Sequence, residues 1–134
     1  LLKIYENKLE KKFIRRTSDP RFLCSALPSL GRVKIALKVP FKLYALTDIP
    51  NGTSVTLMAF TNRCQSCVVL NNEAEMNWNV AEFSKLKFMS SSGRGTKFDF
   101  KIIIRAKPEI EIYIQDAIKI TVDGVRKPRS TFLP

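Results

Sequence analysis

The stretches KFDFKIIIR at residues 97–105 and EIEIYIQDAIKITVD at residues 109–123 decide the fold of this chain. In the first, apolar and polar residues alternate, and Ile103 is the only exception. In the second, the apolar residues of one parity are Ile110, Ile112, Ile114, Ile118, Ile120 and Val122. Because successive side chains of a strand point to opposite faces, this period of two predicts two half-buried β-strands.

Glycine and proline divide the rest of the chain into short pieces, a spacing typical of all-β folds. Residues 53–60 and 33–46 are rich in strand-forming types, and Pro40 inside the second range indicates an edge strand or a bulge. Residues 74–88 fit either a helical turn or a strand. With no convincing long helix, the pattern predicts an all-β sandwich or barrel.

The 134 residues, 45% of them apolar, suit one compact domain. Within residues 1–16 the apolar side chains have helical spacing between lysines, arginines and glutamates. This segment is predicted to be an N-terminal arm or a short amphipathic helix. A solvated face is the favoured interpretation of its charges, and contact with phosphates is the alternative.

The chain has a large excess of positive charge, with 23 lysines and arginines against 12 acidic residues and a formal charge of +11. Such an excess predicts a polyanionic partner, with nucleic acid as the first choice and an anionic membrane surface as the second. No apolar run approaches the roughly 20 residues that cross a bilayer, and no signal peptide is recognisable. A soluble, intracellular protein is expected.

Cysteine and histidine usage argues against a metal site and against catalysis. Three cysteines, Cys24, Cys64 and Cys67, suit a reducing compartment better than a disulfide framework. The last two have C-x-x-C spacing, but zinc needs four ligands and the chain has no histidine. Small side chains on or beside a strand are therefore the favoured interpretation. Lack of histidine also removes the commonest general base, so neither an enzyme nor a cofactor is expected.

The end of the last predicted strand is the first candidate binding region. If Ile118, Ile120 and Val122 face the core, alternation places the residues between them on the opposite face, namely Lys119, Thr121 and Asp123. The strand then runs into a basic tail that contains Arg126 and Arg129. Arginine can donate two hydrogen bonds to guanine in the major groove, and an aspartate nearby can fix the guanidinium plane or accept from cytosine. For any single residue, solvated surface is the competing interpretation.

Two further basic segments are candidates. Residues 85–97, KLKFMSSSGRGTK, contain four cations and no acid, and Arg94 lies between two glycines that let the backbone approach a phosphate. The segment does not match the phosphate-binding loop of nucleotide hydrolases. The third candidate is Gly31-Arg32 followed by Lys34.

These segments resemble the Runt domain of core-binding-factor transcription factors. The resemblance rests on SGRGTKF at residues 92–98, AIKITVDG at residues 117–124 with RKPR after it, DPRFLCSALP from Asp19 and ALTDIPNGTSVTLMA from Ala45. It implies an immunoglobulin-like β-sandwich of the p53-like and Runt type, with the domain at residues 17–129 and a C-terminal tail at 130–134. It also implies a nuclear transcription factor that binds a short G-rich, TGTGGT-like site in double-stranded DNA.

The resemblance assigns roles by position. Arg32, Arg126 and Arg129 match family arginines that contact guanines, and Asp123 matches the aspartate that braces them. The remaining implied DNA contacts are Lys34, Lys87, Arg94, Gly95, Lys119, Thr121 and Val122.

This chain also departs from the family pattern. Ser91 and Lys87 stand where arginine is usual, and Ile35 replaces a lysine for which Lys34 can substitute. Gly31 replaces a tryptophan and Val125 a proline. Lower affinity or an altered salt dependence is expected, with guanine recognition retained.

The family also binds a β subunit that does not contact DNA, here through the region of residues 58–70, where FTNRCQSCVVL departs from the pattern. A core-binding-factor β-type partner is therefore held as an open expectation. No membrane partner and no small-molecule substrate are expected. The alternative function is an immunoglobulin-like interaction module that binds an acidic protein or an anionic surface.

Overall fold

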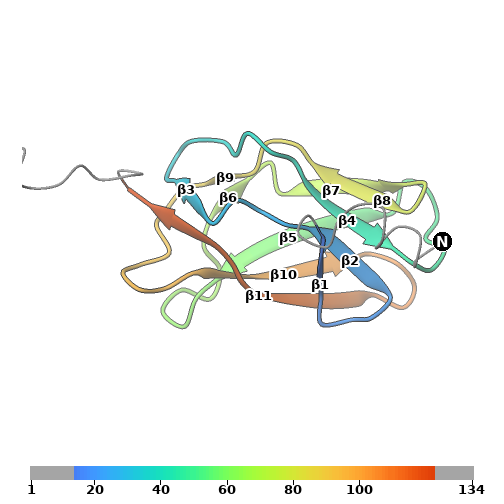
Figure 1. The fold of residues 1–134 in the computed structure, drawn as a ribbon. Coiled ribbons are helices and arrows are strands. Elements are labelled where there is room, and N and C mark those ends of the chain that lie inside the picture. Colours follow the sequence, from blue (N-terminus) through green and yellow to red (C-terminus); the bar gives the residue numbers. More distant parts are fainter. Residues whose placement is uncertain (1–13, 123–134) are drawn as a thin grey trace, which may run out of the picture.

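The computed structural model describes residues 14–122, and these form eleven strands (Figure 1). The strands are β1 Ile14–Arg16, β2 Phe22–Ser25, β3 Leu30–Arg32, β4 Phe41–Ala45, β5 Ser54–Phe60, β6 Val69–Leu70, β7 Glu73–Asn77, β8 Val80–Phe83, β9 Lys87–Phe88, β10 Phe98–Ile104 and β11 Ile110–Thr121. No helix lies within this part of the chain, so none there could cross a bilayer.

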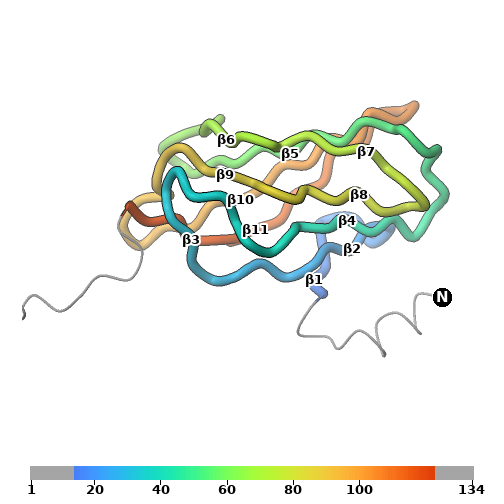
Figure 2. Tube along the Cα trace, turned by 90° about the horizontal axis from the view of Figure 1, so that it is seen from above, coloured from blue at the N-terminus to red at the C-terminus, as the bar shows by residue number. Residues whose placement is uncertain are grey.

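Nine of these strands form one sheet that curls into two layers, in the order β1-β2-β4-β8-β7-β5-β10-β11-β3. The first five make one layer and the last four the other; Figure 1 shows one layer above the other, and Figure 2, seen from above, shows their strands overlapping. Strands β6 and β9 pair separately. The predicted all-β, immunoglobulin-like sandwich is confirmed.

Phenylalanine rings join the layers at the centre of the core. The ring of Phe100 on β10 meets Phe41 on β4 edge-on at 5.7 Å and stacks with Phe88 on β9 at 6.0 Å. All three side chains are at most 1% exposed. Truncating a buried phenylalanine to alanine costs about 3–5 kcal/mol, so these contacts are a large part of what holds the layers together.

The two strands predicted from residues 97–105 and 109–123 are confirmed as β10 and β11, which pair antiparallel. Their register shifts between Phe98↔Ile118 and Phe100↔Ile114, leaving two extra residues on β11. The Asp99 carboxylate accepts from the Asp116 amide at 2.7 Å and holds this bulge. Alternation is interrupted within the bulge, where Gln115 and Asp116 are both exposed and Ala117 and Ile118 are both buried. Because the shift is two residues, the same parity faces the core on both sides of it.

The prediction of Val122 as a core residue is wrong. Its side chain is 66% exposed, because β11 ends at Thr121.

The prediction of one strand over residues 33–46 is wrong for its first half. Residues 33–40 form turns, and β4 begins only after Pro40. The amides of Lys34 and Leu37 donate to the carbonyls of Phe88 and Leu86, each at 2.8 Å, so this segment bonds across to the β9 region. Of the other candidates, residues 53–60 hold β5, and residues 74–88 hold most of the β7–β8 hairpin followed by β9.

For Ile14–Arg16 the expected helix or arm is wrong, because these residues form β1. They pair with β2, and Arg15 Nη2 donates to the Gln115 carbonyl at 2.7 Å. The folded part therefore begins before residue 17. Residues 1–13 and the tail at 130–134 lie outside the described residues.

The cysteines differ from expectation in one respect. Cys64 and Cys67 are joined as a disulfide in the loop before β6, whereas small side chains on or beside a strand in a reducing compartment were expected. Cys24 is free and buried, and its burial raises the pKa of the thiol to about 12, although Arg15 partly opposes this shift. Its thiol is therefore protonated and unreactive at neutral pH.

Close packing of β3 against β11 depends on Gly31. A Cβ atom at this position would lie 2.8 Å from Ile120 Cδ1 and 3.1 Å from Leu37 Cδ2. The isoleucines of β11 thus occupy the space that a larger residue at position 31 would need.

We predict that Gly31→Val destabilises the domain by about 1–3 kcal/mol, because overpacking forces Ile120 and Leu37 out of their positions. Chemical denaturation of the full chain measures the change. Leu30→Val is the matched control, since Leu30 is 37% exposed and should tolerate the change with little effect. Equal stability of both variants would contradict this account of the packing.

Candidate nucleic-acid interface

The parallel pairing of β3 with β11 brings the first and the third candidate segments together. Arg32 lies opposite Thr121 and Leu30 opposite Lys119. The bonding continues past the strand, where the Val33 amide donates to the Thr121 carbonyl at 2.9 Å. Arg32 is exposed, so its guanidinium projects from an edge that the backbone fixes.

Ser92 ties the loop between β9 and β10 to the same strand end. Its amide donates to the Ile120 carbonyl at 3.0 Å, and its hydroxyl oxygen accepts from the Ile120 amide at 3.1 Å. The Ser92 side chain is almost fully buried. Beyond it Gly93 has φ +100°, which favours glycine, and Arg94 is exposed. The loop is thereby docked on β11 while its arginine faces solvent.

Lys119 is part of this docking. Its Nζ donates to the Gly93 carbonyl at 2.9 Å and to the Thr96 carbonyl at 3.5 Å. Beside it is an open hollow of about 310 Å³, lined by Ser91, Gly93, Arg94, Gly95, Lys119, Ile120, Thr121 and Val122. Lys119 was expected to contact DNA directly, and in this structure its ammonium group supports the loop that carries Arg94.

Lys34 and Lys87 come together through a backbone contact. The Lys34 amide donates to the carbonyl of Phe88, the residue after Lys87 on β9. Lys34 has φ 65°, unusual for a long side chain, and it is exposed.

The sequence around these elements is one-sided in charge. Residues 20–47, which contain β2, β3 and β4, have no acidic residue, and neither do residues 83–98, which contain β9 and its following loop. Between them they carry nine lysines and arginines. The positive charges of these two segments attract the phosphates of DNA, and neither segment contributes a carboxylate that would repel them.

The structure gathers eight of the predicted site residues around one end of the sandwich. They are Arg32, Lys34, Lys87, Arg94, Gly95, Lys119, Thr121 and Val122. Asp123, Arg126 and Arg129 lie outside the described residues, beyond the end of β11. Sequence reasoning missed Ser92, because nothing in a run of three serines marks the one that becomes buried. Residues 14–122 contain no group of acidic and cysteine side chains suited to a metal ion.

We predict that Lys119→Met loosens the loop. Losing a charge-assisted hydrogen bond to Gly93 should speed amide exchange at Ser92 and Thr96 by about tenfold. Hydrogen exchange followed by NMR measures it. Lys97→Met removes the same charge from an exposed position near the loop, and it should leave both amides unchanged. Equal exchange rates of the Ser92 and Thr96 amides in the two variants would show that Lys119 does not support the loop.

Comparison with known proteins agrees with this architecture. The model of the Runt domain family matches residues 3–131. The chain is 35% identical over 118 residues to the Runt-related transcription factor rnt-1 of Caenorhabditis elegans, an alignment that covers 88% of this chain and 39% of that protein. The chain therefore spans well under half the length of this relative. A family match over most of the chain, on an all-β sandwich, shows that the chain belongs to the Runt domain family.

Proposed function

We propose that this chain is the DNA-binding domain of a nuclear transcription factor, and that it recognises a short G-rich duplex site of the TGTGGT type. The observation that carries the proposal is the β3–β11 pairing with the docked Ser92 loop, which presents Arg32 and Arg94 from one end of the sandwich. Family membership and the name of the C. elegans relative support it.

The residues divide into three tasks in this proposal. Arg32 binds guanines together with Arg126 and Arg129 from the basic segment that follows β11, because a planar guanidinium fork suits guanine O6 and N7. Lys34 and Lys87 neutralise phosphates, for which a point charge is sufficient. Lys119 and Ser92 hold the loop, so that Arg94 and the Gly95 backbone reach the duplex from a fixed position.

Two departures from the family should lower the salt dependence of binding. Ser91 is exposed at the loop where the family pattern has arginine, and Ile35, also in place of a cation, is 50% exposed. For each phosphate contact that is lost with a cation, the DNA releases about one counterion fewer when the domain binds.

The DNA test compares two variants on a fluorescent TGTGGT duplex and on a guanine-substituted duplex, at two salt concentrations. Arg32→Ala should weaken binding to the TGTGGT duplex by about 1–3 kcal/mol and erase the preference at one guanine. Lys87→Ala should weaken both duplexes alike and lower the salt slope by about one.

Discrimination between the duplexes that survives Arg32→Ala would remove Arg32 from base recognition. Equal and steeply salt-dependent binding of both duplexes by the unmodified chain would instead reduce the function to attraction for polyanions, which is the alternative interaction module.

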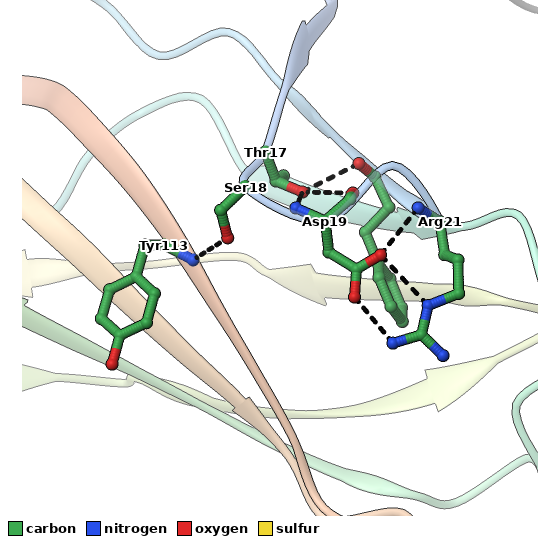
Figure 3. Close-up of polar contacts among 6 residues, drawn as sticks. Thr17, Ser18, Asp19, Arg21 and Tyr113 are labelled. Carbon is green, nitrogen blue, oxygen red and sulfur yellow. Dashed lines mark hydrogen bonds and ion pairs between the residues drawn. The ribbon is translucent and has the colours of Figure 1, made fainter.

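We also propose that the outer face of β5, β10 and β11 binds a core-binding-factor β-type subunit. This face carries Tyr113, 42% exposed, whose ring meets Phe60 edge-on at 6.4 Å. Two hydrogen bonds join Ser18 to the Tyr113 backbone. The Ser18 amide donates to the Tyr113 carbonyl at 3.0 Å, and the Ser18 hydroxyl oxygen accepts from the Tyr113 amide at 2.8 Å. Figure 3 shows the second of these bonds. The backbone of Tyr113 is thus tied to Ser18, and its ring offers a large aromatic side chain of the kind that anchors interfaces.

Polar groups next to this pair form a fixed rim. Arg21 donates to both carboxylate oxygens of Asp19, at 3.1 and 2.7 Å, and the hydrogen bond from Arg21 lowers the pKa of the Asp19 carboxyl (Figure 3). Both groups are therefore charged at neutral pH, and the Arg21 side chain, 53% exposed, can meet a partner at the edge of the interface.

For this partner we predict that Tyr113→Lys weakens binding of the β subunit by at least about tenfold, because it replaces an apolar anchor with a charge. Calorimetry with the β subunit of the same species measures the loss. Val39→Lys adds the same charge at a 49% exposed site on the loop before β4 and should have no effect. If the unmodified chain does not bind the β subunit, this partner is excluded, and the proposal of DNA binding is not affected.

A further inference from the structure

Trp78, the single tryptophan of the chain, is 85% exposed at the tip of the β7–β8 hairpin. With φ values of 54° and 65°, Trp78 and Asn79 form the two-residue turn. Such turns favour Asn-Gly, and a bulky aromatic residue rarely has positive φ. The indole neither fills the core nor suits the turn, so the stability of the fold does not account for it.

Hydrogen bonds to the loop before β5 hold the turn in place. Asn51 Oδ1 accepts from the Trp78 amide at 2.8 Å. Asn79 Oδ1 accepts from the Ile49 amide at 2.9 Å, and the Asn79 carbonyl accepts from the Ala45 amide at 2.8 Å. The backbone under the indole is therefore fixed relative to residues 45–51, while the ring itself remains in solvent.

The indole borders a concave surface. An open pocket of about 360 Å³ is lined by Asp48, Ile49, Pro50, Asn51, Trp78 and Asn79. A larger hollow of about 670 Å³ shares Asp48, Ile49 and Pro50 with it and extends toward Glu109 and Glu111. The two hollows meet at residues 48–50 and offer room for an extended peptide segment.

The Asp48 carboxylate favours a positively charged ligand at this surface. Its carboxylate accepts from the neutral Asn79 amide at 3.3 Å, and within residues 14–122 it forms no ion pair. The other carboxylates around the hollows do have cations, with Asp19–Arg21 and Glu109–Arg105 at 2.7 Å and Glu111–Lys101 at 3.6 Å. An uncompensated carboxylate beside an exposed indole face fits a guanidinium, which can stack on the ring and pair with the acid.

We propose that this surface docks an arginine-bearing segment of a partner protein. Figures 1 and 2 both show the β7–β8 hairpin at the end of the sandwich away from β3, so a bound segment would not meet the DNA interface. The proposal uses none of the residues assigned to DNA. Trp78 and Asp48 are not assigned to the β subunit either, although Asp19 and Arg21 from the rim of that face also line the larger hollow.

The test follows the emission of Trp78 itself, which as the only indole reports this surface directly. The full chain, without DNA, is titrated with a short capped peptide that carries one arginine between two leucines. The control peptide has citrulline, a neutral isostere, in place of the arginine. We expect a saturable change in emission and about fivefold tighter binding of the arginine peptide. This comparison needs no variant and is independent of any effect of mutation on folding.

Two variants locate the binding. Asp48→Asn should reduce the preference for arginine to less than about twofold, because the charge is lost while the pocket keeps its shape. Glu82→Gln removes an exposed carboxylate that lies opposite Lys42 on the same layer, outside the pocket, and should change nothing.

Three results would overturn the proposal. The first is no saturable change in emission, and the second is equal binding of the citrulline peptide. The third is an indole already shielded from acrylamide quenching in the free chain at low concentration, which would mean that another part of the chain or a second copy covers it.

Discussion

The contact on which the basic end depends is the approach of β3 to β11 at Gly31. With no side chain at this position, Ile120 and Leu37 fill the space, and the two backbones pair in parallel. That pairing fixes Arg32 beside Thr121. The loop between β9 and β10 also binds at this strand end, because both the amide and the carbonyl of Ile120 form hydrogen bonds with Ser92. One buried strand end thereby positions two segments that are about 60 residues apart in the sequence.

This arrangement separates the charges that support the site from the charges that face solvent. Lys119 donates hydrogen bonds to the carbonyls of Gly93 and Thr96 and so stiffens the loop. Its charge also adds positive potential at this end of the domain, which does not require contact with a phosphate. Arg32 and Arg94 are exposed and keep their donors for a partner. A loop ordered before binding has less conformational entropy to lose when the partner arrives, so the support that Lys119 gives the loop favours affinity independently of any contact of its own.

Alternation in the sequence predicted much of this. It identified β10 and β11, and it placed Lys119 and Thr121 on the face opposite Ile118 and Ile120, because the period of two depends only on backbone geometry. Alternation failed where contacts between segments distant in the sequence determine whether a residue lies in a strand or is buried. Residues 33–40 look β-forming, yet they form no strand, and the amides of Lys34 and Leu37 bond to the β9 region. Ser92 resembles its neighbours, and only the docked loop buries it.

Positive φ values at long side chains mark both ends of the domain. Lys34 at the basic end and Trp78 at the opposite end each have φ above 50°, where an L-residue other than glycine or asparagine costs about 1–2 kcal/mol. In both cases a hydrogen bond to another element holds the strained amide, from Lys34 to the Phe88 carbonyl and from Trp78 to Asn51 Oδ1. The same bonds would form with glycine or asparagine at either position, at lower cost. The fold therefore gains nothing from the lysine or the indole, and what each position provides is a side chain directed into solvent at a fixed place.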